Sequence, residues 1–306
     1  MDKIIEYIKE FRIKIFFITS ITRVLRKIRI KQEIIEKVEK WKYKKIIAFL
    51  NQKYKEDIVI PNIKSEGGYI SKSSPIWIFW WQGEKFMPDI VKACYNSVKK
   101  NKNQHTVNLI TKENIKKYVH FDDDIYNKVE NGNISLTHFS DIIREKLLYE
   151  YGGIWMDATI YMTSPFPEKM YRYDYYTLKG AFEYWKWTGF FQASTVKNTF
   201  PYIISHLFDL YWKEHSQLIT YLLIDCLFTV AYMNCNEVKK KIDKLENTDN
   251  SVFCLNDKLL DEKYDEEILK KLDERSNIHK LSYKYKHNKL LNDEITFYGK
   301  LLQEID

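Results

Sequence analysis

Glycine is scarce in this chain, at 9 of 306 residues. Neither a Gly-x-Gly-x-x-Gly fingerprint nor a Gly-x-x-x-x-Gly-Lys loop occurs in the sequence. These glycine-rich turns bring backbone N–H groups against the phosphates of dinucleotides and nucleotides. Their absence argues against a Rossmann dinucleotide-binding protein and against a P-loop protein.

Cysteine is also sparse, and its four residues are scattered at Cys94, Cys226, Cys235 and Cys254. None of them forms a Cys-x-x-Cys pair or a His/Cys cluster with the spacing of a zinc site. Reduced, mostly buried thiols are typical of cytosolic proteins. The sequence therefore predicts a cytoplasmic protein without a structural zinc ion or a disulfide framework.

Long apolar runs are missing as well. The first apolar run, residues 15–18, is short and has basic residues on both sides, unlike a signal peptide. A helix that spans a bilayer needs about 20 apolar residues in succession. We therefore expect no signal peptide and no membrane-spanning helix, which leaves peripheral contact with the inner face of the cell membrane as the predicted route to a bilayer.

Positive charge is unevenly distributed along the chain, whose net charge is +7. Residues 1–55 hold 16 Lys and Arg against 6 Asp and Glu, and the remaining 33 basic and 36 acidic residues give a net charge of −3. Nucleic-acid-binding proteins carry a basic stripe or groove on the folded body. We therefore expect no nucleic-acid partner.

Residues 1–60 are predicted to be a basic, amphipathic helical extension ahead of a domain at 61–306. The apolar residues at its start recur at helical spacing, namely Ile4, Ile5, Ile8, Phe11, Ile15 and Ile18. Two interpretations are open. The stripe packs on the rest of the protein, or the extension lies on an anionic membrane surface. Both can be true if opposite faces of the helix make the two contacts. The basic residues that favour a membrane surface through residues 1–55 are Arg23, Arg26, Lys27, Arg29 and Lys31.

The chain from residue 75 onward has the alternation of an α/β protein. Residues 75–81 are apolar and are followed by Gln82-Gly83, a pattern typical of a buried strand that ends in a turn. Residues 88–100 have helical spacing, and residues 107–110 form a second strand. This order predicts a mixed, mainly parallel sheet flanked by helices.

Three charged residues stand out in the middle of the chain. A helix is predicted from about Ser140, its N-cap candidate, to Gly152-Gly153. Asp141 and Arg144, three residues apart, then share a face of its first turn. A strand follows and ends at about Asp157, at the sheet edge where α/β proteins bind ligands. Each feature also has a structural explanation, as a helix ion pair or a turn-capping carboxylate.

The motifs in their order resemble those of one known family. They are Ile78–Glu84, Thr137–Asp141 with Arg144, Tyr151-Gly152-Gly153-x-x-x-Asp157, and Ile278–Lys284. Together they resemble the bacterial capsular polysaccharide synthesis family, which is related to GT-A-fold glycosyltransferases such as the yeast initiating mannosyltransferases and the large clostridial glucosylating toxins. The resemblance covers about residues 75–290.

The resemblance implies a fold and an activity. The domain at 61–306 would have a GT-A-like fold. The enzyme would transfer a sugar, with retention of anomeric configuration, from a nucleoside diphosphate sugar such as a UDP-sugar. The acceptor would be a lipid-linked or soluble glycan of a surface polysaccharide, and the cofactor Mn²⁺ or Mg²⁺.

The resemblance also implies roles for individual residues. Asp141 and Arg144 would contact the donor sugar and its phosphates. The metal would be held by Asp157, Thr159 and His279. Trp80, which would stack on the base, and Gln82 would lie near the nucleotide, and Lys280 or Lys284 would neutralise the leaving diphosphate.

One departure from the family pattern is clear in the sequence. Residues 157–159 read Asp-Ala-Thr instead of Asp-x-Asp, so Thr159 provides a neutral oxygen in place of a carboxylate. Asp225, alone in an apolar helix, is a candidate acid for the acceptor site or one half of a buried structural pair. The departure keeps a second function open, that of a non-catalytic protein that binds sugar nucleotides or glycans.

Overall fold

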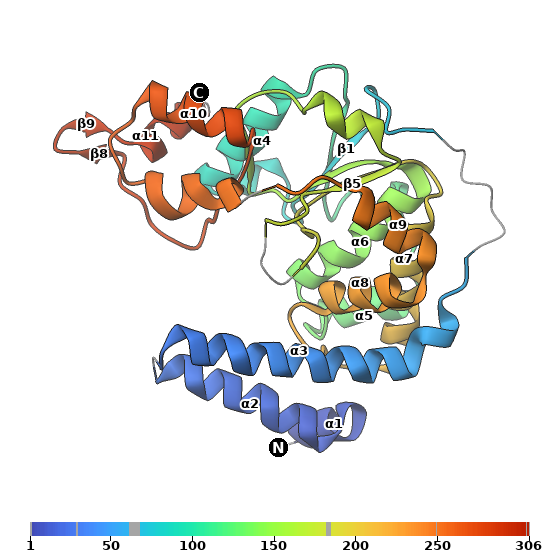
Figure 1. The fold of residues 1–306 in the computed structure, drawn as a ribbon. Helices are drawn as coiled ribbons and strands as arrows, with labels where there is room; N and C mark the ends of the chain where they lie inside the picture. Colours follow the sequence, from blue (N-terminus) through green and yellow to red (C-terminus); the bar gives the residue numbers. More distant parts are fainter. Residues whose placement is uncertain are drawn as a thin grey trace. The chain divides into compact units, whose positions relative to one another are not determined.

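The computed structural model describes residues 2–28, 30–60, 68–181, 185–248, 250–303 and 305. The chain divides into two compact units, each formed by segments that are distant in the sequence (Figure 1). The first unit comprises residues 1–61, 121–142 and 203–239. The second unit comprises residues 62–120, 143–202 and 240–306.

The first unit is helical. Its complete helices are α1 (Asp2–Phe11), α2 (Ile13–Lys27), α3 (Gln32–Tyr54), α5 (Asp123–Glu130) and α8 (Leu223–Asn234). Three further helices run from one unit into the other, namely α6 (Leu136–Tyr151), α7 (Thr199–Glu214) and α9 (Asn236–Lys244). None of the helices in the described ranges is long and apolar enough to cross a membrane.

The N-terminal helices pack within this unit, as one of the two interpretations of their sequence predicted. Phe11, Ile15 and Ile18 are buried, and the Phe11 ring lies 4.8 Å from the His215 ring on the segment after α7. The Glu10 carboxylate lies 3.2 Å from His215 Nδ1. The apolar face of α1 and α2 therefore forms part of the core of the first unit.

Two predictions for this region fall outside the described residues. Arg29 is one of the basic residues assigned to a membrane surface, and its position is not among those described. Residues 61–67, at the predicted boundary after residue 60, are not among them either. The boundary between extension and domain stays a prediction.

The second unit contains a five-stranded sheet with the order β2-β1-β3-β6-β5. Its strands are β1 (Ile76–Phe79), β2 (Val107–Ile110), β3 (Gly153–Met156), β5 (Tyr175–Thr177) and β6 (Phe191–Ser194). β1 is parallel to β2 and β3, whereas β6 is antiparallel to β3 and β5, so four strands run in one direction. The predicted mixed α/β class with a mainly parallel sheet is confirmed.

Burial explains the apolar strand sequences. Every residue of β1, β3 and β6 is buried, as expected for strands covered on both faces. The predicted helix at 88–100 is α4 (Asp89–Asn101), whose apolar side packs inward with buried Ile90, Val91 and Cys94. Among the described residues, the other strands and α-helices of this unit are β4 (Ile160–Met162), β7 (Ile278–Lys280), β8 (Leu290–Leu291), β9 (Glu294–Ile295), α10 (Glu266–Arg275) and α11 (Phe297–Leu302).

The helix that carries Asp141 and Arg144 begins earlier than predicted. α6 starts at Leu136, and Ser135 caps it, because its Oγ accepts a hydrogen bond of 3.2 Å from the His138 N–H. Ser140 lies inside the helix and donates its hydroxyl proton to the Thr137 carbonyl. The predicted cap at Ser140 is wrong, and Asp141 and Arg144 lie in later turns than the first.

The end of α6 is as predicted. Gly152 and Gly153 have φ angles of 61° and 98°, in the left-handed region that favours glycine. A Cβ at Gly153 would lie 2.3 Å from the Pro75 carbonyl oxygen, so only glycine lets β3 run this close to the segment before β1. β3 then ends at Met156, and Asp157 leaves the sheet at its carboxyl edge.

Candidate functional site

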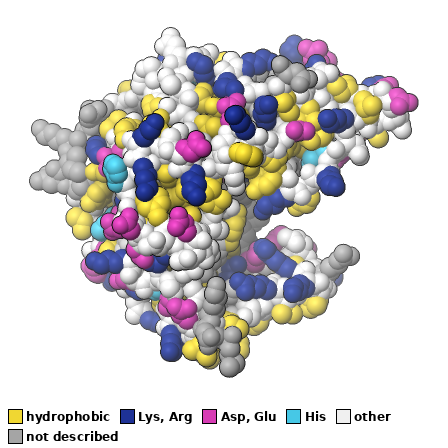
Figure 2. Space-filling model, turned by 180° about the vertical axis from the view of Figure 1, so that it is seen from behind, with side chains coloured by type: hydrophobic (Ala, Val, Ile, Leu, Met, Phe, Trp, Pro, Cys, Tyr) yellow, Lys and Arg dark blue, Asp and Glu magenta, His cyan; other side chains and the backbone are white. Residues whose placement is uncertain are grey.

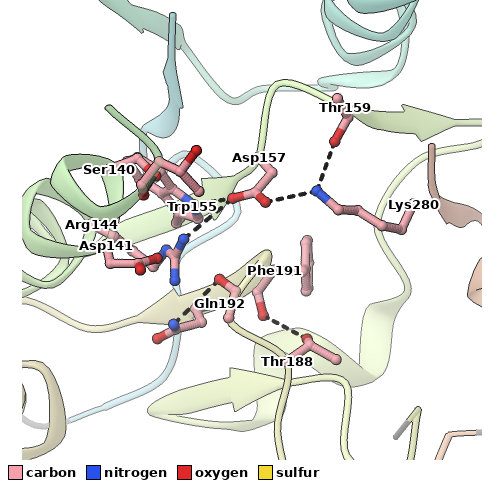
Figure 3. A network of polar contacts seen from close by, with 12 residues as sticks. Ser140, Asp141, Arg144, Trp155, Asp157, Thr159, Thr188, Phe191, Gln192 and Lys280 are labelled. Carbon is pink, nitrogen blue, oxygen red and sulfur yellow. Dashed lines mark hydrogen bonds and ion pairs between the residues drawn. The ribbon is translucent and has the colours of Figure 1, made fainter. Parts of the chain in front are cut away.

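The carboxylate of Asp157 is the centre of a charged cluster in the second unit (Figure 3). Its Oδ1 accepts hydrogen bonds from Trp155 Nε1 at 3.0 Å and from Arg144 Nη2 at 3.3 Å. Its Oδ2 accepts one from Lys280 Nζ at 2.7 Å. Trp155 was not among the predicted site residues, although side chains two apart on a strand point to the same face.

Arg144 reaches this carboxylate from α6. Its side chain is 3% exposed, and its guanidinium lies 5.1 Å from the centre of the Trp155 ring. A Cβ on Gly189 would lie 2.9 Å from Arg144 Nη1, so the absence of a side chain at 189 leaves room for the guanidinium. The arginine is therefore held in one orientation by an aromatic face, a carboxylate and a close backbone.

Lys280 approaches Asp157 from the other side, on β7. β7 pairs antiparallel with β4, and Lys280 stands opposite Ile160, three residues after Asp157. Lys280 Nζ donates to Asp157 Oδ2 and to Thr159 Oγ1, each at 2.7 Å. The structure therefore brings together Arg144, Asp157, Thr159 and Lys280, four residues that the sequence proposed for the site.

Two positive charges face one negative charge in this cluster. Burial alone would raise the pKa of Asp157, but the charges of Lys280 and Arg144 outweigh it and lower the pKa to about 2. Asp157 is therefore ionised at neutral pH. Arg144, Asp157 and Lys280 together carry a net charge of +1, which suits an anionic ligand.

A buried chain of hydrogen bonds lies next to Arg144. The Tyr175 hydroxyl donates to Gln192 Oε1 at 2.8 Å, and Gln192 Nε2 donates to Glu145 Oε1 at 3.1 Å. All three side chains are buried. Since Glu145 is the neighbour of Arg144 on α6, this network fixes the helix turn that carries the arginine. Sequence reasoning missed Gln192 and Glu145, because their pairing depends on a contact 47 residues apart.

The residues predicted to contact the nucleotide lie at the same edge of the sheet. In the parallel register, Trp77 stands opposite Trp155, so Trp80 and Asp157 both leave their strands at the carboxyl end. The Trp80 ring is partly exposed and meets the Tyr283 ring edge-on at 5.7 Å. Gln82 and Lys284 are exposed. Their roles toward a nucleotide stay predictions.

His279 is not part of the charged cluster. It is fully buried, and its Nε2 lies 3.4 Å from Thr163 Oγ1. Successive strand residues point to opposite faces, so Lys280 faces Asp157 while His279 faces away from it. Burial lowers the pKa of His279 to about 4, which makes it neutral at neutral pH.

The residues present do not fit a divalent cation well. Mg²⁺ and Mn²⁺ prefer several oxygen ligands, with carboxylates foremost. No group of three or more His, Cys, Asp or Glu residues in the described parts of the chain could hold a metal ion. At a separation of about 4 Å, a pair of unit charges is worth about 4 kcal/mol at an effective dielectric constant of 20. A dication beside Asp157 would face the positive charges of Arg144 and Lys280 with one carboxylate to offset them.

Two other predicted residues belong to the first unit. Asp141 is buried, and its Oδ2 lies 3.5 Å from His138 Nδ1. Trp212 Nε1 donates to His138 Nε2 at 3.1 Å, so this ring nitrogen acts as an acceptor. Asp225 is buried on α8 in the same unit. His138, which lies next to Asp141, was not a predicted site residue, although it occurs in the Thr137–Asp141 motif.

The comparisons with known proteins identify the family. The family described as "Capsular polysaccharide synthesis protein" matches residues 26–301, most of the chain. The chain belongs to the capsular polysaccharide synthesis family. This confirms the family that the motifs resembled, and it supports the predicted class of enzyme, a glycosyltransferase.

No curated protein matches the chain. Among solved structures, this capsular polysaccharide synthesis protein is similar to one titled "PaToxG Glycosyltransferase", with 17% identity and a TM-score of 0.41. The match covers 65% of this chain and 80% of that one.

Proposed function

We propose that this protein transfers a sugar from a nucleoside diphosphate sugar, with UDP as the expected nucleotide, to a lipid-linked or soluble glycan acceptor. The observation that carries the proposal is the Arg144–Asp157–Lys280 cluster at the carboxyl edge of the sheet. In a member of the capsular family, a fixed guanidinium and an ammonium are suited to bind the diphosphate of the donor.

The reaction requires a bond exchange at the anomeric carbon. The bond from this carbon to the β-phosphate oxygen breaks, and its electron pair remains on that oxygen. The acceptor hydroxyl oxygen forms the new bond to the carbon, and its proton passes to the departing diphosphate. Arg144 and Lys280 stabilise the negative charge that grows on the diphosphate, which is where preorganised charges lower a barrier most.

Retention of the anomeric configuration is part of the proposal, by analogy with the related families. In that case the acceptor hydroxyl approaches the anomeric carbon on the face from which the diphosphate departs. The released diphosphate is then the nearest base for the acceptor proton. The anomeric configuration of the product, determined by NMR, tests this part independently of the rest.

A screen of nucleotide sugars tests the proposed function. The purified full-length chain would be incubated with each donor, and released nucleoside diphosphate would be detected by mass spectrometry, with and without a glycan acceptor. Release of nucleoside diphosphate from one particular donor, accelerated by one particular acceptor, supports a transferase. Tight binding of a donor without any release would support the alternative, a non-catalytic sugar-nucleotide-binding component.

We further propose that α2 contacts an anionic membrane surface. Ile15 and Ile18 face the core, whereas a second apolar stripe on α2 is exposed, with Phe17 at 56% and Val24 at 54%. This second stripe comprises Ile13, Phe17, Ile21, Val24 and Ile28. Exposed basic residues flank it, namely Arg12, Lys14, Arg23, Arg26 and Lys27. An apolar stripe between basic side chains is typical of helices that lie in a membrane interface.

One face of the molecule has mixed charge. On the face that Figure 2 shows, Lys and Arg side chains are interspersed with acidic and apolar ones. Such a surface does not concentrate positive potential in one groove. The basic, apolar face of α2 is therefore the stronger candidate for contact with a lipid surface.

Replacing Phe17 and Val24 together by glutamate is expected to weaken binding to phosphatidylserine-containing vesicles by at least about tenfold, since it removes apolar area and adds repulsion. Vesicle co-sedimentation measures the effect. Ile268→Glu, which changes an exposed apolar residue on α10, provides the control and should leave binding intact. Equal binding of all three proteins would contradict the membrane proposal. Point variants are preferable to deletion of residues 1–55, because that deletion would remove core residues such as Phe11 and Leu50.

A further inference from the structure

The Lys280 ammonium group lies between the first and third residues of the acidic motif, the positions whose side chains the family resemblance assigned to a metal ion. This group bridges the two ends of Asp157-Ala158-Thr159, with Nζ at 2.7 Å from both side-chain oxygens. An ammonium group has three N–H donors. Two point at Asp157 and Thr159, which leaves one for an oxygen of a bound phosphate.

The third residue of this motif decides which cation suits the site. A carboxylate at 159 would give a divalent cation a second charged oxygen ligand, the ligand type that hard cations favour. Thr159 offers a neutral hydroxyl, which accepts the Lys280 hydrogen bond and is buried. The single carboxylate of Asp157 is neutralised by the single charge of the Lys280 ammonium group. Arg144 adds a second positive charge to the site.

The position of Lys280 is built into the fold. β7 is hydrogen-bonded to β4 in a register that sets Lys280 opposite Ile160, next to Thr159. The Lys280 side chain is 24% exposed, so part of it is accessible to solvent, and its Nζ lies 5.4 Å from the centre of the Phe190 ring. The lysine is therefore both anchored and able to receive a ligand.

We propose that the Lys280 ammonium group takes the place of a divalent cation in this protein, so that the donor diphosphate binds and departs without a metal ion. The inference rests on the proposed function, because it assigns the charge that stabilises the leaving diphosphate. It replaces the Mn²⁺ or Mg²⁺ that the family resemblance implied. Arg144 and Lys280 then place two positive charges next to a diphosphate that carries two negative charges in the donor and gains one more when its bond to the sugar breaks.

The first experiment measures binding of UDP, with GDP as a second probe, by calorimetry of the full-length chain. One titration contains a chelator and the other contains Mn²⁺. The dissociation constant is expected to be the same in both. Lys280→Met should weaken binding by about 10- to 100-fold in both, the loss expected for one charge-assisted hydrogen bond. Lys72→Met, which removes a lysine from the exposed Lys72–Glu168 pair, should bind like the unaltered protein.

The second experiment exchanges the cation. Thr159→Asp combined with Lys280→Met restores an Asp-x-Asp pattern and removes the ammonium group. This double variant is expected to bind UDP only when Mn²⁺ is present. A thermal shift with Mn²⁺ and UDP reports on its folding and on metal binding without any need for turnover.

The outcomes separate this inference from the proposed function. Nucleotide binding or turnover of the unaltered protein that is lost in chelator and regained with Mn²⁺ would overturn the role of Lys280 and leave a transferase. Metal-independent binding that depends on Lys280, without turnover of any donor, would overturn the transferase and leave the cation assignment. Absence of nucleoside diphosphate binding in both conditions would overturn both.

Discussion

Asp157→Asn is expected to lower the rate of sugar transfer by about 10²–10³, the effect typical of losing one preorganised charged group. Asparagine keeps the shape of the side chain but removes its negative charge. In the unaltered protein this charge holds Arg144 against one carboxylate oxygen and Lys280 against the other. Without it the two cations repel each other and lose the arrangement that binds a diphosphate. Donor turnover, followed by nucleotide release, measures the loss.

The same substitution should also reduce stability. Removing one partner of a buried ion pair costs about 3–5 kcal/mol, and the partial exposure of Asp157 places the effect at the low end. Circular dichroism and chemical denaturation separate this effect from the loss of rate. Glu168→Gln is the matched control, because it breaks an exposed acid–lysine pair in the same unit. Unchanged turnover in Asp157→Asn would rule out the charged cluster as the site.

Arg144→Met is expected to reduce transfer by about 10² or more, because the guanidinium is buried and cannot be replaced by solvent. Arg144→Lys should restore little of this activity, since an ammonium group cannot both cover the Trp155 ring and keep a planar fork toward an anion. The comparison of kcat and KM for the two variants measures the effect. Arg172→Met, an exposed arginine of the same unit, is the control.

A third variant tests the orientation of Arg144 without changing its charge. Gly189→Val adds a Cβ that would lie 2.9 Å from Arg144 Nη1, too close for the present arrangement, so the guanidinium is expected to shift from its position beside Asp157. Activity is expected to fall in the same direction as in Arg144→Met. Full activity of Gly189→Val together with full activity of Arg144→Lys would show that a fixed guanidinium is not needed.

β1, β2 and β3 could be predicted because they are short, largely apolar runs, whereas β5 (Tyr-Tyr-Thr) and β6 (Phe-Gln-Ala-Ser) have no such pattern and were missed. β1, α4, β2 and the strand that ends before Asp157 follow directly from apolar spacing and from Gly152-Gly153. The start of α6 was harder, since Ser135 and Ser140 are both good cap residues and only hydrogen bonding separates them. Local signals thus predict elements well and their first residues poorly.

The candidate site was harder to predict than the sheet, because it depends on register between distant segments. Lys280 and Asp157 are 123 residues apart, and only the pairing of β7 with β4 decides whether His279 or Lys280 faces the carboxylate. A shift of one residue would exchange the two side chains. The second apolar stripe of α2 was missed for a different reason, namely that a helix apolar on two faces shows no single period.

The excess positive charge of the Arg144–Asp157–Lys280 cluster also bears on how fast a donor arrives. Attraction between a cationic site and an anion raises the frequency of productive encounters, and dissolved ions screen it over a distance of about 8 Å at physiological ionic strength. Capture of the donor is therefore a property of the surrounding salt as well as of the protein. At high donor concentration this dependence disappears, because encounter no longer limits the reaction.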